Sequence, residues 1–179
     1  YLKAKGIQVV LTREPGGTEV GEKIRELLLS NSTGDMHADT ELMLMFSARN
    51  EHVQNKIMPA LERGDWVLSD RFTDSSYAYQ GGGRGLDISR ISQLESWVMQ
   101  DFAPDMTLLL DVPVEIGMSR VESRGKKDRI EMEKMDFFDR VRQAYIARSK
   151  EFPDRIKLID SSKTIEHTTE QIAAILDTL

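Results

Sequence analysis

The chain has 179 residues, of which 40% are hydrophobic and 30% charged, and its formal net charge at pH 7 is -6. Its length and composition predict one soluble domain spanning residues 1–179, with no apolar run long enough to cross a bilayer. The complete absence of cysteine excludes a disulfide framework and a thiolate zinc site and favours a cytoplasmic protein, while the negative charge argues against a general nucleic-acid binder.

The first predicted elements are a strand, a glycine-bearing loop and a helix. Residues 1–6 resemble the last turn of a helix, and residues 7–12 form a β-branched apolar run that predicts a strand. The strand ends in the polar loop 13–18, where Thr18 is placed to cap a helix. Arg25 flanks the apolar stripe of that helix, so its side chain is either solvated or aimed along a cleft. The stripe consists of Val20, Ile24, Leu27 and Leu28.

A second helical region is predicted from about residue 40 to residue 63. Pro59 should kink or divide it, because proline removes a helical N–H. Phe46 and Arg49 are three residues apart and share a face of this helix. An aromatic ring beside a guanidinium could sandwich a base and hydrogen-bond to it. A core phenylalanine with an arginine at its rim is the simpler interpretation when the pair is taken alone.

A polar, glycine-rich run, residues 69–85, follows a short apolar strand. In an open α/β sheet, ligands gather outside the carboxyl ends of strands, and Asp70 and Arg71 lie at such an end. Arg71 offers a donor fork suited to phosphate oxygens, and Asp70 could hold Mg²⁺ directly or through water. A solvated Asp-Arg pair before a glycine turn is the alternative. Groups that could read a base or sugar edge follow on Ser75, Ser76, Tyr79 and Gln80.

The second half of the chain continues the alternation of helices and strands. The predicted elements are a helix capped by Asp87, a strand over 107–112, a helix opened by Pro113, a helix over 136–151, a strand over 156–160 and a closing helix from about Ile165. This order predicts an α/β fold, a doubly wound parallel sheet with flanking helices. His37, His52 and His167 lie in unrelated local contexts, so we expect no histidine metal site.

A basic segment, residues 120–131, leads out of the helix that Pro113 opens. It carries Arg120, Arg124 and Arg129 together with two lysines. Such a segment could be a mobile lid that places arginines on a transferring phosphoryl group. Taken alone, a basic surface patch is the simpler interpretation.

Several motifs, in this order and spacing, carry a family resemblance. They are Thr12-Arg13-Glu14-Pro15-Gly16-Gly17-Thr18, Phe46 to Arg49, Asp70-Arg71-Phe72, Ser75 to Gly85, Thr107 to Val112 and Asp128-Arg129-Ile130-Glu131. Over essentially all of its length the chain resembles the bacterial thymidylate kinases, which are P-loop nucleoside-monophosphate kinases. The resemblance implies transfer of the γ-phosphoryl group of ATP to dTMP with Mg²⁺, giving dTDP and ADP for dTTP biosynthesis. It also implies a cytoplasmic homodimer that binds neither nucleic acid nor membrane.

The resemblance implies roles for the phosphate-binding side chains. Arg71 and Arg25 would bind the dTMP phosphate, with Glu14 close to the sugar and phosphate end. Asp70 would help to hold Mg²⁺. The lid would bring arginines down onto the ATP phosphates and the transferring group. Its candidates are Arg129, Arg124 and Arg120.

For the base, the resemblance implies that Arg49, Ser76 and Gln80 read the edge of thymine. The family usually stacks thymine on an aromatic side chain four residues before the arginine, and that position is Met45 here. Phe46 follows directly, so either side chain could cover the base. A related nucleoside or nucleotide kinase and a P-loop-less dTMP-binding homologue are the alternative functions.

One departure from the family is large. No G-x-x-x-x-G-K-[ST] motif occurs in the sequence, and the glycines between Gln80 and Gly85 are not followed by Lys-Ser/Thr. We therefore expect the P-loop unit, a central strand with its loop and helix of roughly 25 residues, to lie outside this sequence. Residues 1–179 alone are then expected to be inactive, although they could still bind dTMP.

Overall fold

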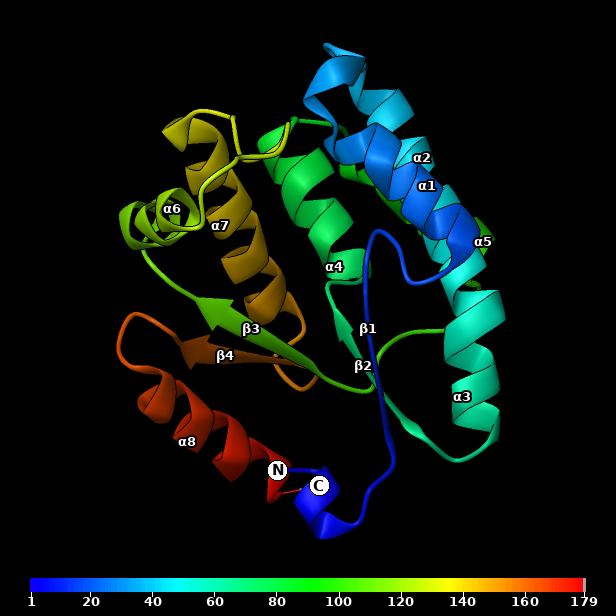
Figure 1. The fold of residues 1–179 in the computed structure, drawn as a ribbon, viewed down its shortest axis with the longest axis vertical. Helices are drawn as coiled ribbons and strands as arrows, with labels where there is room; N and C mark the ends of the chain where they lie inside the picture. The colour runs from blue at the N-terminus through cyan, green and yellow to red at the C-terminus, as the bar shows by residue number, and fades with distance from the viewer. Residues whose placement is uncertain (179) are drawn as a thin grey trace.

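The computed structural model describes residues 1–178 as an α/β fold in which helices surround parallel strands (Figure 1). Strand β1 (Val9–Arg13) pairs in parallel with β2 (Trp66–Asp70), and β3 (Thr107–Asp111) pairs in parallel with β4 (Ile156–Asp160). The strands predicted from the sequence are therefore confirmed, with small shifts at their ends.

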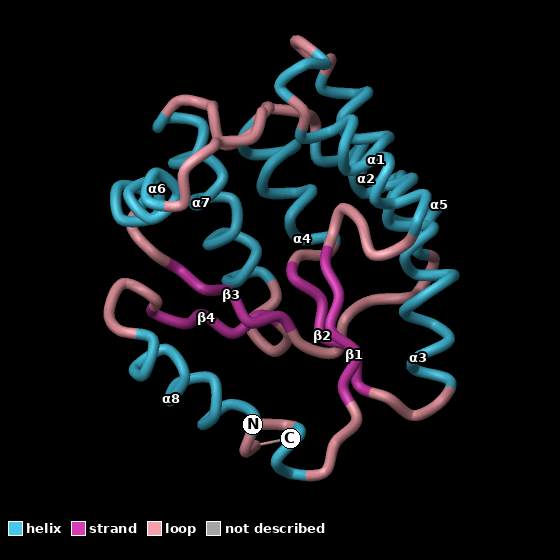
Figure 2. The backbone as a smooth tube through the Cα atoms, in the orientation of Figure 1, coloured by secondary structure: helices cyan, strands magenta, loops and turns pink. Residues whose placement is uncertain are grey.

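The strands of the described residues form two separate sheets, β1–β2 and β3–β4, as Figure 2 shows. This differs from the single doubly wound sheet that we expected, because no pairing joins the two halves within residues 1–178. On one face of the first sheet, Leu11 and Leu68 are register partners and are 63% and 51% exposed. This apolar face is therefore not covered by the described part of the chain.

Three helices pack together beside the first sheet. Helix α1 (Glu19–Leu29) begins at Thr18, whose hydroxyl accepts a hydrogen bond of 3.0 Å from the Gly21 N–H, so the predicted cap is confirmed. Helix α2 (Ala38–His52) packs on α1 and on α5 (Ile88–Met99). Short 3₁₀ turns at Lys3–Lys5 and Asn31–Thr33 precede β1 and α2.

The long helical region predicted around Pro59 is divided. A wide π-helical turn, Val53–Ile57, follows α2, and a short helix α3 (Met58–Glu62) continues after it. Proline offers no N–H and its ring crowds the preceding turn, and a widened turn accommodates both effects. The predicted division is confirmed.

The glycine-rich run after β2 is helical, although its composition did not predict a helix. Helix α4 (Thr73–Ser76) continues into a π-helical turn over Tyr77–Gly83, and α7 (Met135–Glu151) packs along it. A Cβ on Gly83 would lie 2.4 Å from the ring of Phe137. The glycines therefore allow two helical segments to approach closely, which local turn chemistry does not reveal.

The remaining helices are α6 (Val114–Ser123) and α8 (Ile165–Leu176). The predicted lid is split, because residues 120–123 end α6 and residues 124–134 form the connection to α7. Within residues 1–178, none of the helices has both the length and the apolar character that crossing a membrane requires.

Candidate active site

The ends of β1 and β2 bring two polar segments together. Arg13 and Asp70 are register partners, and the Glu14 N–H donates a hydrogen bond of 2.9 Å to the carbonyl of Asp70. The segments that follow the two strands therefore start side by side. This is the edge where the sequence predicted a ligand site.

Glu14 is the centre of a buried polar network at this edge. Its carboxylate is 5% exposed and accepts a hydrogen bond of 2.7 Å from Arg49 Nε. The other carboxylate oxygen lies 3.0 Å from Nδ1 of His52, whose Nε2 lies 2.6 Å from the hydroxyl of Thr12. Arg49 also donates to the Ser76 hydroxyl at 3.1 Å. The network fixes Arg49 in one orientation before any ligand arrives.

Phe46 and Met45 lie in different environments. Phe46 is 1% exposed and belongs to a core cluster with Leu42, Tyr77 and Ile91. The Arg49 guanidinium carbon lies 4.7 Å from the centre of the Phe46 ring, which is a cation–π contact. Met45 instead lines the cavity beside Arg49. Of the two candidates, Met45 is the one that lines this cavity.

A cavity at the strand ends gathers most of the predicted dTMP-binding side chains. Those of the prediction that line it are Glu14, Met45, Arg49, Arg71, Ser76 and Gln80. Pro15, Ser75 and Tyr79 complete the lining. The sequence had offered Ser75 and Tyr79 as polar groups, whereas Pro15 was not foreseen as a lining residue.

Positive charge accumulates at one end of this site. Arg71 adopts a left-handed backbone conformation (φ 71°), and its guanidinium carbon lies 4.8 Å from the centre of the Tyr79 ring. Arg25 donates a hydrogen bond of 2.8 Å to the Pro15 carbonyl. Partial burial and repulsion from Arg13 and Arg71 lower the pKa of Arg25 below its ordinary value, against the attraction of Glu22. Crowded guanidinium groups of this kind favour a bound anion.

Comparison with known proteins identifies the family. The family model described as thymidylate kinase matches residues 1–172. The chain belongs to the thymidylate kinase family. It is 70% identical to the thymidylate kinase of Ruthia magnifica, in an alignment that covers all 179 residues of this chain and 87% of that protein. It is 50% identical to the thymidylate kinase of Nitrosospira multiformis, and this alignment also covers all 179 residues and 87% of the relative. The crystal structure of the Ehrlichia chaffeensis thymidylate kinase superposes with a TM-score of 0.77 at 34% identity, covering 95% of this chain and 80% of that one.

Asp70 ends β2 and directly precedes Arg71, which lines the cavity. Among the described residues, no group of three or more His, Cys, Asp or Glu side chains could enclose a metal ion. A single carboxylate fits Mg²⁺ nevertheless, since this ion keeps several waters and takes the rest of its ligands from substrate phosphates.

The three arginines of the predicted lid contact different parts of the protein and do not meet at one site. Arg129 is mostly buried and donates to the Leu28 carbonyl at 2.8 Å and to Glu41 Oε2 at 2.6 Å. Arg120 donates to the Ser161 carbonyl at 3.0 Å. The Arg124 side chain is 67% exposed and paired with Glu131. The structure therefore holds Arg129 against α1 and α2 and leaves Arg124 at the surface.

Two buried side chains of the site were missed by the sequence reasoning. His52 is fully buried and bridges Glu14 to Thr12. Glu41 is 1% exposed and binds Gln80 and Arg129. The spacing of Arg49 and His52 on one helix could have indicated a shared face. No sequence pattern around Glu41 indicates that this residue is buried or that it binds Gln80 and Arg129.

Proposed function

We propose that the protein is a thymidylate kinase that transfers the γ-phosphoryl group of ATP to dTMP, giving dTDP and ADP. The observation that carries this proposal is the cavity at the ends of β1 and β2, which gathers Arg49, Ser76, Gln80 and Arg71. Family membership over nearly the whole chain favours this function over a related nucleotide kinase or a dTMP sensor.

dTMP would lie with its base toward α2 and its phosphate toward the strand ends. Arg49 and Ser76 offer donors to the thymine edge, and Met45 covers the ring. Arg71 and Arg25 bind the phosphate through their guanidinium groups. Glu14 acts through Arg49, because its carboxylate holds that guanidinium in place.

The transfer itself requires little proton movement. A phosphate oxygen of dTMP attacks the γ-phosphorus, and the bond from that phosphorus to the ADP oxygen breaks. The second pKa of a phosphate ester is about 6, so the attacking group is largely ionised near neutral pH. Asp70 would help to hold Mg²⁺, which supplies neutralisation of phosphate charge when bound. The protein's own contribution is to position dTMP and to surround the transferring group with arginine charge, including Arg124 from the lid.

The ATP phosphates need a further element. We propose that a P-loop unit outside residues 1–179 holds them, that its strand joins the two sheets, and that these residues alone do not turn over. The absence of a G-x-x-x-x-G-K-[ST] motif supports this proposal. So do the separate sheets and the uncovered apolar face at Leu11 and Leu68.

The test is a kinase assay on the full-length natural protein beside residues 1–179 alone. The full-length protein should convert dTMP to dTDP only when Mg²⁺ is present, whereas residues 1–179 should release no ADP. dUMP, dCMP and thymidine serve as competing acceptors. Binding of dTMP without any ATP consumption by the full-length protein would replace the kinase with a sensor. Turnover by residues 1–179 would overturn the proposed P-loop unit.

We also propose that the protein is a cytoplasmic homodimer. A groove between α2 and α5 supports the dimer, because the apolar side chains of Leu42, Met43, Leu94 and Trp97 line it together with Asp39, Arg90 and Gln93, and Trp97 is 78% exposed. Light scattering on the full-length protein should give twice the chain mass, and Trp97→Lys should reduce it. A monomeric mass at micromolar concentration would overturn the dimer.

A further inference from the structure

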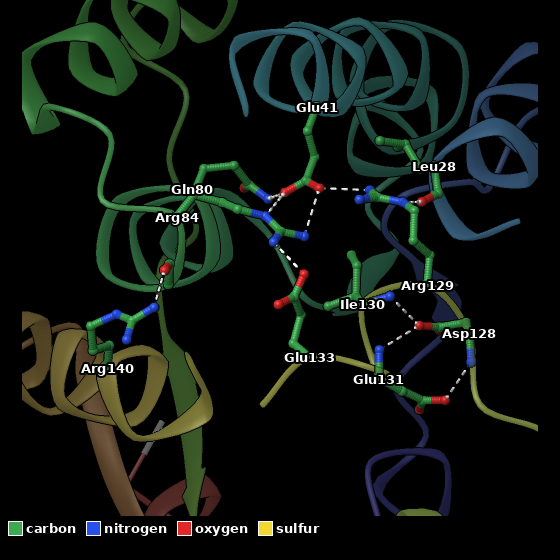
Figure 3. A network of polar contacts seen from close by, with 11 residues as sticks. Leu28, Glu41, Gln80, Arg84, Asp128, Arg129, Ile130, Glu131, Glu133 and Arg140 are labelled. Carbon is green, nitrogen blue, oxygen red and sulfur yellow. Dashed lines mark hydrogen bonds and ion pairs between the residues drawn. The ribbon is translucent and has the colours of Figure 1, made fainter. Parts of the chain in front are cut away.

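Glu41 is a buried carboxylate on which donors from three side chains converge, as Figure 3 shows. Gln80 Nε2 donates to Oε1 at 2.9 Å, and Arg129 Nη2 donates to Oε2 at 2.6 Å. Arg84 donates to both oxygens, at 3.2 Å from Nε and 3.1 Å from Nη2. The acceptor capacity of the carboxylate is therefore largely used.

This carboxylate is held in its ionised form. Burial opposes the ionisation of Glu41, but the hydrogen bonds from Arg84, Gln80 and Arg129 outweigh it and keep the pKa below its ordinary value. An ionised carboxylate can only accept hydrogen bonds. The Gln80 group that faces Glu41 must therefore be the NH₂ group, and the amide cannot turn over without placing its oxygen against a buried negative charge.

The fixed orientation of the Gln80 amide decides which of its groups can face the cavity. Gln80 is 1% exposed and lines the cavity beside Arg49. With Nε2 turned toward Glu41, the carbonyl oxygen Oε1 is the acceptor that the side chain offers to a ligand. An acceptor at this position suits the N3–H of thymine. It opposes cytosine, whose N3 carries a lone pair and no hydrogen.

We infer that Glu41 is a specificity-determining positioning residue, which fixes the Gln80 amide so that the cavity accepts thymine and uracil and rejects cytosine. This inference rests on the proposed function, since it requires dTMP to occupy the cavity. Arg84 and Arg129 act one step further out, because they keep the charge of Glu41 buried and in place. Arg129 thereby links the segment 124–134 to base selection.

The experiment is calorimetric titration of the full-length protein with dTMP, dUMP and dCMP, in the unchanged protein and in Glu41→Gln. A neutral amide at position 41 can both donate and accept, so Gln80 is free to turn and present its NH₂ group. The preference for dTMP over dCMP should fall by roughly tenfold or more, the range for one mismatched buried hydrogen bond. The preference for dTMP over dUMP should not change, because these bases share the same N3 edge.

Two further variants keep the result interpretable. Gln80→Met removes the oriented amide and leaves Glu41 with both arginines, so it should also lose dTMP-over-dCMP preference even where Glu41→Gln fails to fold. Glu51→Gln is the matched control, because Glu51 is an acid on the same helix that accepts a hydrogen bond from Asn55 at the surface. It should bind all three nucleotides like the unchanged protein.

The outcomes separate this inference from the proposed function. An unchanged dTMP-over-dCMP preference in a folded Glu41→Gln or Gln80→Met protein that still binds dTMP overturns the inference alone. An equal loss of dTMP, dUMP and dCMP affinity also overturns it, because that result indicates a purely structural role. Failure of the unchanged protein to bind dTMP overturns the proposed function itself.

Discussion

Two arginine–carboxylate pairs in this protein have the same chemistry and opposite environments. In the cavity wall, the side chains of Arg49 and Glu14 are 3% and 4% exposed and join at 2.7 Å. On the lid, the side chains of Arg124 and Glu131 are 67% and 24% exposed. A buried pair is costly to break because an unpaired charge remains, whereas water and salt screen an exposed pair. The first arrangement suits an arginine that must stay still, and the second suits one that must leave its partner to reach a phosphate.

The largest effect is expected from breaking the buried pair. Glu14→Ala leaves the Arg49 guanidinium without its carboxylate and His52 without its acceptor. The free energy of unfolding should fall by about 3–5 kcal/mol, measured by urea denaturation at pH 7. Glu131→Ala breaks the exposed pair and should change it by less than about 1 kcal/mol. Similar losses in the two variants would remove the distinction between the two pairs.

The lid pair should show its role in turnover instead. Arg124→Ala should lower kcat by about 100-fold, because one donor to the transferring phosphoryl group is lost. Its free energy of unfolding should stay within about 0.5 kcal/mol of the unchanged protein. Lys126→Ala, which removes a neighbouring exposed cation, is the control and should retain most of kcat. Full activity in Arg124→Ala would exclude this arginine from the transfer step.

The sequence predicted the local elements well because their signals are local. The apolar runs of β1 to β4, the cap at Thr18 and the break at Pro59 each depend on residues within one or two turns. The cavity residues came from the family resemblance, since Glu14, Arg49 and Gln80 are too far apart in the chain for spacing to connect them. The single sheet that we expected is not confirmed, because within residues 1–178 β1 pairs with β2, β3 pairs with β4, and no pairing joins the two pairs.

The features that the sequence missed depend on tertiary contacts. Glu41 lies 39 residues from Gln80 and 88 from Arg129, so no periodic pattern could reveal that it binds both. The same contact could not be predicted for Arg129 either, since a motif places an arginine in the chain but not its guanidinium in space. The helical form of the glycine run was not predicted, because the residue that it contacts closely, Phe137, lies on a distant helix.

The bridge made by His52 gives a smaller test of the cavity wall. His52→Leu keeps the volume but leaves the Thr12 hydroxyl and one Glu14 oxygen without a partner. The free energy of unfolding should fall by about 1–3 kcal/mol in urea denaturation. His37→Asn is the matched control, because the His37 side chain is 78% exposed and asparagine can also cap α2. A stability loss in the control equal to that in His52→Leu would argue against a special role for the buried bridge.

The smallest effect concerns an exposed carboxylate and its dependence on pH. Hydrogen bonds from the Ser162 hydroxyl and N–H hold the pKa of Asp160 below its ordinary value. Because the folded pKa is the lower one, Asp160 stabilises the fold above the unfolded value of about 4 and loses this contribution as the pH falls below it. Asp160→Asn should therefore be slightly less stable than the unchanged protein near pH 6, and the gap should close near pH 2. Urea denaturation across this range measures the gap, with exposed Asp101→Asn as the control. A gap that stays constant with pH would show that the Asp160 charge contributes nothing.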